Sequence, residues 1–302
     1  MLRYRLLLGP VLIAVIVAVL WADEALDRAA VPGALAPLLG GRATFPPGVG
    51  LLTLALAASP LAAGELARIL RANGIGASTL LTWIATVCGL LVACLVPTAM
   101  PAPRAVMIVA TAATFVLILS ILHASRGRTV EGVVASAGGA LLAFVYLGLL
   151  FGFILALRRE HSAWVVLWII LVTKSSDIGA YFTGRAIGRH KLIPWLSPGK
   201  TWEGAVGGVA LATAVGAAGA GLVPMPAGFP ALAAWQGAAL GATLAVVGQV
   251  GDLVASLLKR DAGLKDSSNA LPGFGGVLDV IDSPLLAAPA AYWLLAAFSS
   301  PH

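Results

Sequence analysis

Charged residues are scarce in this chain. Asp, Glu, Lys and Arg make up 11% of its 302 residues, whereas soluble domains carry about 25%. Hydrophobic residues make up 60%, and the mean hydropathy is +0.97. Because so few charges cannot cover the surface of a soluble domain of this size, the composition predicts a membrane protein. At about 20 residues per span, the chain has room for about ten crossings at most.

Cysteine is equally scarce. The only two cysteines, Cys88 and Cys94, lie in one apolar run, and in a helix they would be about 9 Å apart, too far for a disulfide bond. The net charge of +6 is compatible with nucleic acid, but anchoring of loops on the cytoplasmic side of a membrane explains it better. A lipid phosphate or a nucleotide is the other partner that such charge can serve. We therefore expect no nucleic-acid partner.

Nine apolar stretches follow one another along the chain. They lie near residues 5–21, 49–64, 76–97, 105–123, 132–156, 164–183, 204–223, 232–251 and 280–298. The sequence therefore predicts an all-α fold, a polytopic transmembrane helical bundle of about nine spans, with the first stretch an uncleaved span. The amino terminus and the even-numbered loops carry 13 Lys and Arg, and the odd-numbered loops carry 5. This bias places the amino terminus and the most polar loops in the cytoplasm, which predicts a multi-pass protein of the cell membrane.

The first 160 residues contain few polar groups. Glu65, Arg68 and Arg71 end the second apolar stretch, and we interpret them as anchors at the membrane interface, where long side chains extend toward water. His123 and His161 stand alone at span ends and receive no role. We expect residues 1–160 to form a scaffold of transmembrane helices.

Seven of the 13 Asp and Glu lie after residue 170. Within the segment 173–185, Lys174 and Asp177 interrupt an apolar run, and such charges are costly in hydrocarbon, so they must face protein or water. Lys174, Asp177 and Tyr181 share a helix face, and Ser176 stands beside them. An ion pair that only fixes helix packing is the alternative interpretation.

The segment 188–204 is basic and is broken by glycine and proline. Lys200 and Thr201, with the backbone N–H groups around them, could bind a polyphosphate. The glycine spacing is not that of a P-loop, and no strand is expected before it. A positively charged cytoplasmic loop without a ligand is the alternative.

The densest polar cluster lies between residues 251 and 282. Asp252, Ser256 and Lys259 are spaced four and three residues apart on one helix face. After a glycine-rich turn, Asp279 and Asp282 share a face at the start of the last span. Helix capping accounts for one carboxylate of this pair. It does not account for both of them entering the membrane together with two further carboxylates.

These carboxylates point to a metal-assisted reaction. Several carboxylates with serine hydroxyls, and no set of His or Cys ligands, suit a hard cation such as Mg²⁺. The neighbouring Lys and Arg suit the phosphates that such a cation would bridge. Together the three segments predict a phosphoryl-transfer site at the cytoplasmic interface, in a catalytic region formed by residues 161–302.

The third segment resembles the signature of the phosphatidate cytidylyltransferase family, the enzymes that make CDP-diacylglycerol. That signature runs Ser-x-x-Lys-Arg, four residues, Lys-Asp, a Pro-Gly-His-Gly-Gly turn and Asp-Arg-x-Asp. The matching positions are Ser256, Lys259, Arg260, Lys265, Asp266, Pro272, Gly273, Gly275, Gly276, Asp279 and Asp282. The segments 177–181 and 197–204 resemble the family's upstream motifs, so the resemblance covers about residues 170–285.

The resemblance implies that CTP and phosphatidic acid react at this site, within the lipid bilayer's cytoplasmic face, to give CDP-diacylglycerol and pyrophosphate. The expected metal ligands for Mg²⁺ are Asp252, Asp279, Asp282 and Asp177. The expected catalytic residues are Asp252, Lys259, Arg260, Lys265, Asp266, Asp279 and Asp282. The expected substrate-binding residues are Lys174, Ser176, Tyr181, Lys200, Thr201 and Ser256.

Two positions depart from the signature. Phe274 stands where the family usually has His, and Val280 stands where it usually has Arg. Phenylalanine cannot transfer a proton or hold a phosphate. The attacking lipid phosphate is already anionic, however, so it needs its charge screened and its geometry fixed rather than a general base. We therefore expect an active enzyme, and a catalytically inactive lipid-binding paralogue is the alternative.

Two further functions stay open. An enzyme that uses another lipid phosphate, such as an isoprenoid ether lipid, would carry similar motifs. A transporter would explain charges inside a span, but it should show broken segments repeated in two halves, and no internal repeat is apparent. Glycine pairs such as Gly204 and Gly208 permit close helix packing, either within the bundle or in a homodimer.

Overall fold

The computed structural model describes residues 2–34, 36–37, 41–96, 100–127, 130–225 and 231–299, with side chains from residue 7 onward. The elements in chain order are α1 (Leu2–Leu26), α2 (Val49–Ala72), α3 (Thr79–Leu95), α4 (Ala102–Ser125), α5 (Val133–Ala143), η1 (Phe144–Leu149), α6 (Leu150–Glu160), α7 (Ala163–Ile187), β1 (Lys191–Ile193), β2 (Ser197–Thr201), α8 (Trp202–Ala220), α9 (Ala234–Asp261) and α10 (Val277–Ser299). The short π-helical segment η1 joins α5 and α6 into one continuous span.

Each predicted apolar stretch corresponds to one helical span in the described part of the chain. Eight spans are long and apolar enough to cross a membrane, and α3, with 17 residues, is a shorter apolar helix. The prediction of an all-α, multi-pass membrane bundle is therefore confirmed. The one departure is local, because the segment expected as an irregular loop contains the antiparallel hairpin β1–β2.

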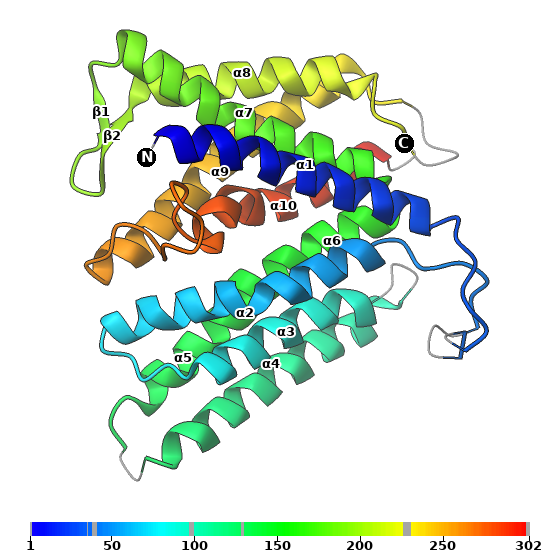
Figure 1. Cartoon of the computed structure of the whole chain (residues 1–302), viewed down its shortest axis with the longest axis vertical. Helices are drawn as coiled ribbons and strands as arrows, with labels where there is room; N and C mark the ends of the chain where they lie inside the picture. The colour runs from blue at the N-terminus through cyan, green and yellow to red at the C-terminus, as the bar shows by residue number, and fades with distance from the viewer. Residues whose placement is uncertain are drawn as a thin grey trace.

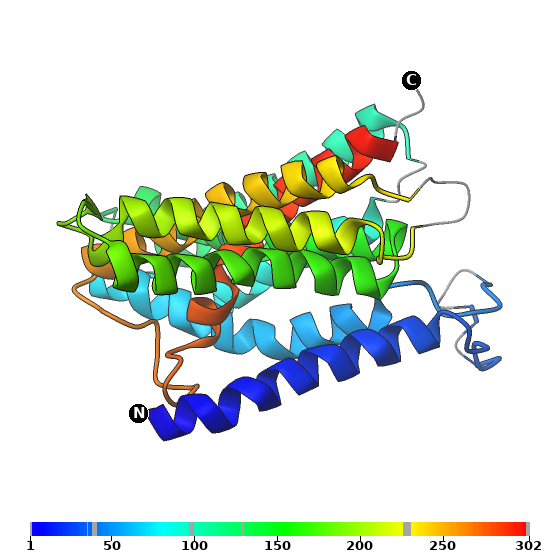
Figure 2. The same ribbon diagram turned by 90° about the horizontal axis from the view of Figure 1, so that it is seen from above.

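Consecutive helices cross the bundle in alternate directions. In Figure 1 the start of α1, the hairpin β1–β2 and the connection from α9 to α10 all lie at one end of the bundle, and α10 ends at the opposite end. Figure 2 shows α1 along the edge of the bundle, beside α2. The two loops that the sequence marked as polar therefore share one end with the amino terminus.

Small residues bring α7 and α8 into close contact. A Cβ atom on Gly208 would lie 2.6 Å from the backbone oxygen of Ser176, and one on Gly204 would lie 2.8 Å from that of Ala180. Contacts this short require glycine, as in other closely packed membrane helices. These glycines therefore serve the chain's own bundle, and a homodimer stays a prediction.

The opposite end of the bundle is fixed by a buried ion-pair network. Arg158, at the end of α6, donates hydrogen bonds to Asp23 (2.5 Å) and Asp27 (2.7 Å), which lie at the end of α1 and just beyond it. Glu24 accepts a hydrogen bond from the backbone N–H of Ala163 at the start of α7 (2.6 Å). Because buried charges are stable only when paired, these contacts join α1 to the corner between α6 and α7.

The span that contains η1 packs against α3 through backbone atoms. A Cβ atom on Gly148 would lie 2.6 Å from the Cα of Gly89 and 2.7 Å from the backbone oxygen of Thr86. No side chain can be accommodated at such a contact without moving one helix. The orientation of η1 about its axis is therefore set by this pair of glycines.

We expect Gly148→Ala to destabilise the bundle by about 1–3 kcal/mol, the usual result of overpacking a tight contact. The matched control is Gly138→Ala in the same span, because a Cβ atom there would meet no atom within 4 Å. The measurement is the apparent melting temperature of each purified variant in detergent. Equal melting temperatures for the two variants would contradict the contact between η1 and α3.

Candidate active site

Helix α7 carries the first two charges of the site. Lys174 and Asp177 are half-buried and form an ion pair of 3.4 Å on one face of the helix, as their spacing predicts. Ser176 is buried, and its hydroxyl accepts a hydrogen bond from the side chain of Gln249 on α9 (3.1 Å). Tyr181 is exposed, and its hydroxyl accepts a hydrogen bond from Arg185 (2.9 Å) instead of joining the other two.

The hairpin β1–β2 brings a lysine to the core of the site. Lys200, on β2, forms an ion pair of 2.6 Å with Asp252 on α9. The neighbouring Thr201 is the N-cap of α8, because its hydroxyl accepts a hydrogen bond from the backbone N–H of Gly204 (3.1 Å). At the two ends of the hairpin, Nδ1 of His190 and Oε1 of Glu203 lie 2.6 Å apart. The hairpin thus presents Lys200 at a fixed place, and Thr201 has a structural role that the sequence did not reveal.

A second lysine links α9 to α10. Lys259, in the last turns of α9, forms an ion pair of 2.5 Å with Asp279 in the first turn of α10, and the side chains are only 10% and 9% exposed. The other oxygen of Asp279 accepts hydrogen bonds from the backbone N–H of Ser267 (2.8 Å), the Ser267 hydroxyl (2.7 Å) and the backbone N–H of Gly276 (2.8 Å). Asp279 therefore closes the loop of residues 262–276 onto both helices.

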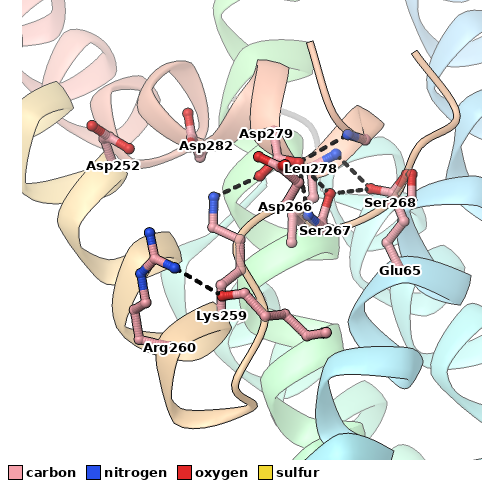
Figure 3. Close-up of polar contacts among 12 residues, drawn as sticks. Glu65, Asp252, Lys259, Arg260, Asp266, Ser267, Ser268, Leu278, Asp279 and Asp282 are labelled. Carbon is pink, nitrogen blue, oxygen red and sulfur yellow. Dashed lines mark hydrogen bonds and ion pairs between the residues drawn. The ribbon is translucent and has the colours of Figure 1, made fainter. Parts of the chain in front are cut away.

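Glu65, on α2, holds the same loop from the other side. It is 5% exposed and accepts hydrogen bonds from the hydroxyls of Ser267 (3.0 Å) and Ser268 (2.6 Å). It also accepts from the backbone N–H groups of Val277 (3.0 Å) and Leu278 (2.8 Å), the first two residues of α10. Figure 3 shows it reaching across from α2 to this helix start. A carboxylate placed there accepts hydrogen bonds from free N–H groups and is stabilised by the positive end of the helix dipole.

The interpretation of Glu65 as an interface anchor is wrong. Helix α2 continues to Ala72, so Glu65 is buried well before its end, and Arg68 donates to the backbone oxygens of Asp266 and Ser267. Both side chains are part of the loop's support. The one signal in the sequence was a carboxylate inside an apolar run, and nothing in the sequence indicated a partner about 200 residues away.

The glycine-rich turn fits between these two carboxylates because it lacks side chains. A Cβ atom on Gly276 would collide with the Ser267 hydroxyl and the Glu65 carboxylate. Gly273 and Gly275 have φ angles of 86° and 93°, in the left-handed region that favours glycine. The glycines of the signature are therefore required for Glu65 and Asp279 to approach one loop from two sides.

Two further carboxylates, those of Asp252 and Asp282, lie beyond this loop. Helices α9 and α10 are in contact there, because a Cβ atom on Gly251 would lie 3.0 Å from the backbone oxygen of Asp282. In Figure 3 the carboxylates of Asp252 and Asp282 point to the same side of the site. Asp282 is 4% exposed and, among the described residues, forms no ion pair. One of its oxygens accepts from the backbone N–H of Ser283 (2.6 Å).

The carboxylates fit a magnesium ion of a particular kind. Within the described ranges, no group of three or more His, Cys, Asp or Glu is close enough to form an all-protein metal site. Mg²⁺ is commonly held by one or two carboxylates together with substrate phosphates. Asp282 and the neighbouring Asp252 suit that arrangement, whereas Asp279 already accepts four hydrogen bonds. Asp252 and Asp177 are each paired with a lysine, Lys200 and Lys174. The metal assignment stays a prediction.

The remaining residues of the signature lie at the border of the site. Arg260 is exposed and contacts the backbone oxygen of Leu264, and the side chains of Lys265 and Asp266 are exposed on the loop. Ser256 is half-buried on α9. The structure brings Lys174, Lys200 and Lys259 to the carboxylates and leaves these four residues around them. Phe274 points its ring toward α1, within 3.5 Å of where a Cβ atom on Gly9 would lie.

Known proteins resemble this chain over a large part of its length. The sequence profile described as "Cytidylyltransferase family" matches residues 28–298. Proteins named phosphatidate cytidylyltransferase are similar to this chain in Brucella suis (46% identical over 136 residues), Pseudomonas aeruginosa (45% over 139) and Bacillus subtilis (38% over 164).

The matched segments cover 45%, 46% and 54% of this chain, respectively. They cover 48%, 49% and 59% of the three relatives, so this chain spans about half the length of the curated relatives that it matches. The profile match, by contrast, extends over nine-tenths of the chain, from the end of α1 to the end of α10. The resemblance drawn from the signature is confirmed, and the chain belongs to the cytidylyltransferase family.

Proposed function

We propose that this protein transfers a cytidylyl group from CTP to phosphatidic acid, giving CDP-diacylglycerol and pyrophosphate. One observation carries the proposal: three elements bring together, at one end of the bundle, the pairs Lys200–Asp252 and Lys259–Asp279 and the buried Asp282, which forms no ion pair among the described residues. Membership of the cytidylyltransferase family gives this arrangement its chemistry. Phosphates that bind there would draw the lysines away from the carboxylates and leave the carboxylates free for a cation.

The chain's own groups account for the reaction. An oxygen of the lipid phosphate forms a bond to the α-phosphorus of CTP while the bond from that phosphorus to the bridging oxygen breaks, and pyrophosphate leaves with the electron pair. Lys200 and Lys259 neutralise charge on the triphosphate, and Lys174 does so on the deeper side of the site. Mg²⁺, held by Asp252 and Asp282, would screen the phosphate charges and fix their geometry. No proton needs to be removed, so Phe274 is compatible with turnover.

Pyrophosphate release from CTP tests this proposal. With Mg²⁺ and phosphatidic acid we expect lipid-dependent turnover, which a chelator removes. Asp282→Asn should lower turnover by at least about 100-fold, because the variant loses a proposed ligand of the cation that would stabilise transition-state charge. The matched control is Glu131→Gln, which alters an exposed carboxylate on another loop.

The outcomes of this assay separate the candidate functions. Release that requires an isoprenoid phosphate instead of phosphatidic acid would replace the lipid substrate and keep the reaction. Folded protein that binds lipid without turnover would instead support the inactive paralogue. Equal turnover for Asp282→Asn and wild type would contradict the proposed site.

Glu65→Gln tests whether α2 supports the site. The amide would keep one acceptor oxygen but would place an NH₂ group against two donors, which leaves buried groups unpaired at a cost of about 1–3 kcal/mol. We expect lower turnover and faster tryptic cleavage after the exposed Lys265, because the loop opens more often.

The control for this change is Glu160→Gln, at the other end of the bundle, where the side chain accepts a hydrogen bond from Tyr292 (2.8 Å). In Glu160→Gln, trypsin should cleave the loop after Lys265 at the wild-type rate. Unchanged cleavage in Glu65→Gln would show that Glu65 does not hold the loop.

We also propose that the site faces the cytoplasm of a bacterial cell. The positive charges on this end of the bundle support that orientation. Trp195, in the hairpin, is 77% exposed and Trp202, at the start of α8, is 58% exposed. Exposed tryptophans are typical of the headgroup level of a membrane, which is where a phosphatidic acid headgroup meets a soluble nucleotide.

Cysteine labelling tests the orientation. In a variant without Cys88 and Cys94, we expect Gly33→Cys to react with a membrane-impermeant maleimide on intact spheroplasts. Gly199→Cys, on the hairpin, should react only after lysis. Both positions are exposed and neither has an atom within 4 Å of an added Cβ, so the substitutions fit. The reverse labelling pattern would place the site outside.

A further inference from the structure

Tyr146 lies buried in the middle of the span formed by α5, η1 and α6. Its side chain is 4% exposed, and its hydroxyl has no hydrogen-bond partner within the described part of the chain. A buried hydroxyl without a partner is unfavourable, and most buried polar groups in folded proteins are hydrogen-bonded. Phenylalanine would fill the same space without this penalty, so the hydroxyl requires an explanation.

The backbone around Tyr146 is also unusual. Residues 144–149 form the π-helical segment η1, a geometry that widens a helix and is frequent at functional sites. Gly148 packs backbone-to-backbone against Gly89 on α3. Residues two apart on a helix point in roughly opposite directions. The contact at Gly148 therefore turns Tyr146 away from α3 and toward the interior of the bundle.

The Tyr146 hydroxyl lies close enough to the site for the charges of Asp282, Asp252 and Asp279 to act on it. None of these carboxylates is within hydrogen-bond distance of the hydroxyl. Tyr146 thus offers the site a hydrogen-bond donor that no described group accepts, from a span outside the segments that carry the family signature.

We propose that the Tyr146 hydroxyl contacts substrate, by donating a hydrogen bond to an anionic phosphate oxygen bound beside Asp252 and Asp282. The inference rests on the proposed function, because it takes the ligand of these carboxylates to be a phosphate, bridged to them by a cation. A phosphate oxygen in that position would supply the acceptor that the protein does not. The lipid phosphate and the nucleotide phosphates share this chemistry.

Kinetics of Tyr146→Phe test the contact. We expect kcat/KM to fall by about tenfold or more, the effect of losing one hydrogen bond to a charged group. The fall should appear with one varied substrate: with phosphatidic acid if the oxygen belongs to the lipid, or with CTP if it belongs to the nucleotide. The apparent melting temperature without substrate should be unchanged or higher, because Phe removes an unpaired buried group. If the hydroxyl had a purely structural role, Tyr146→Phe would instead have a lower melting temperature than wild type.

Tyr292→Phe is the matched control. It removes a tyrosine hydroxyl that donates a hydrogen bond to Glu160 at the opposite end of the bundle. This variant should have the kcat and KM of wild type. Wild-type kinetics for Tyr146→Phe, in protein that turns over, would overturn the proposed contact and leave the proposed function intact.

A binding measurement separates the two proposals if wild-type protein shows no turnover. The probes are phosphatidic acid in detergent micelles and CTP with Mg²⁺, each followed by the rise in melting temperature that it causes. A smaller rise in Tyr146→Phe than in wild type, for either probe, would support the contact although the proposed reaction had failed. Equal rises for both probes would overturn it.

Discussion

Two carboxylates, Glu65 and Asp279, meet at the start of α10, and the loop that carries the family signature is held between them. Each accepts hydrogen bonds from Ser267, and together they take up free N–H groups at and before the helix start. Lys259 forms an ion pair with Asp279. In an apolar bundle, unpaired N–H groups and charges are costly, so few conformations of the loop are stable. The loop's conformation, and with it the position of Asp282 one turn further, follows from this constraint.

The bundle could be predicted because hydrocarbon selects for long apolar runs, which are visible one segment at a time. The spacing of Asp252 and Lys259 on one helix face was visible for the same reason. What joins separate segments was not visible. Glu65 interacts with residues more than 200 positions away, and the ion pair of Lys200 with Asp252 depends on how the hairpin folds back over α9. Local spacing contains no information about such pairs.

Roles were also hidden where one residue type serves two purposes. Thr201 was predicted to bind phosphate because it lies in a basic loop with hydroxyl and backbone N–H donors, and the structure shows that its hydroxyl caps α8. Tyr146 looked like part of an apolar span, because a phenol ring differs from phenylalanine by one atom. Its place opposite the carboxylates depends on the π-helical turn and on the packing of Gly148 against Gly89. Neither feature follows from hydrophobic periodicity.

The substitution of Phe274 for the family's usual histidine can now be considered in physical terms. The ring lies on a turn whose path is set by Gly273, Gly275 and the two carboxylates, so the side chain at 274 is not needed to shape the loop. It extends toward Gly9 on α1, a helix that Arg158 fixes at its far end through Asp23. An apolar ring suits that helix surface better than an imidazole would. The lysines that would neutralise phosphate lie on other elements, so the change at 274 leaves the charges of the site in place.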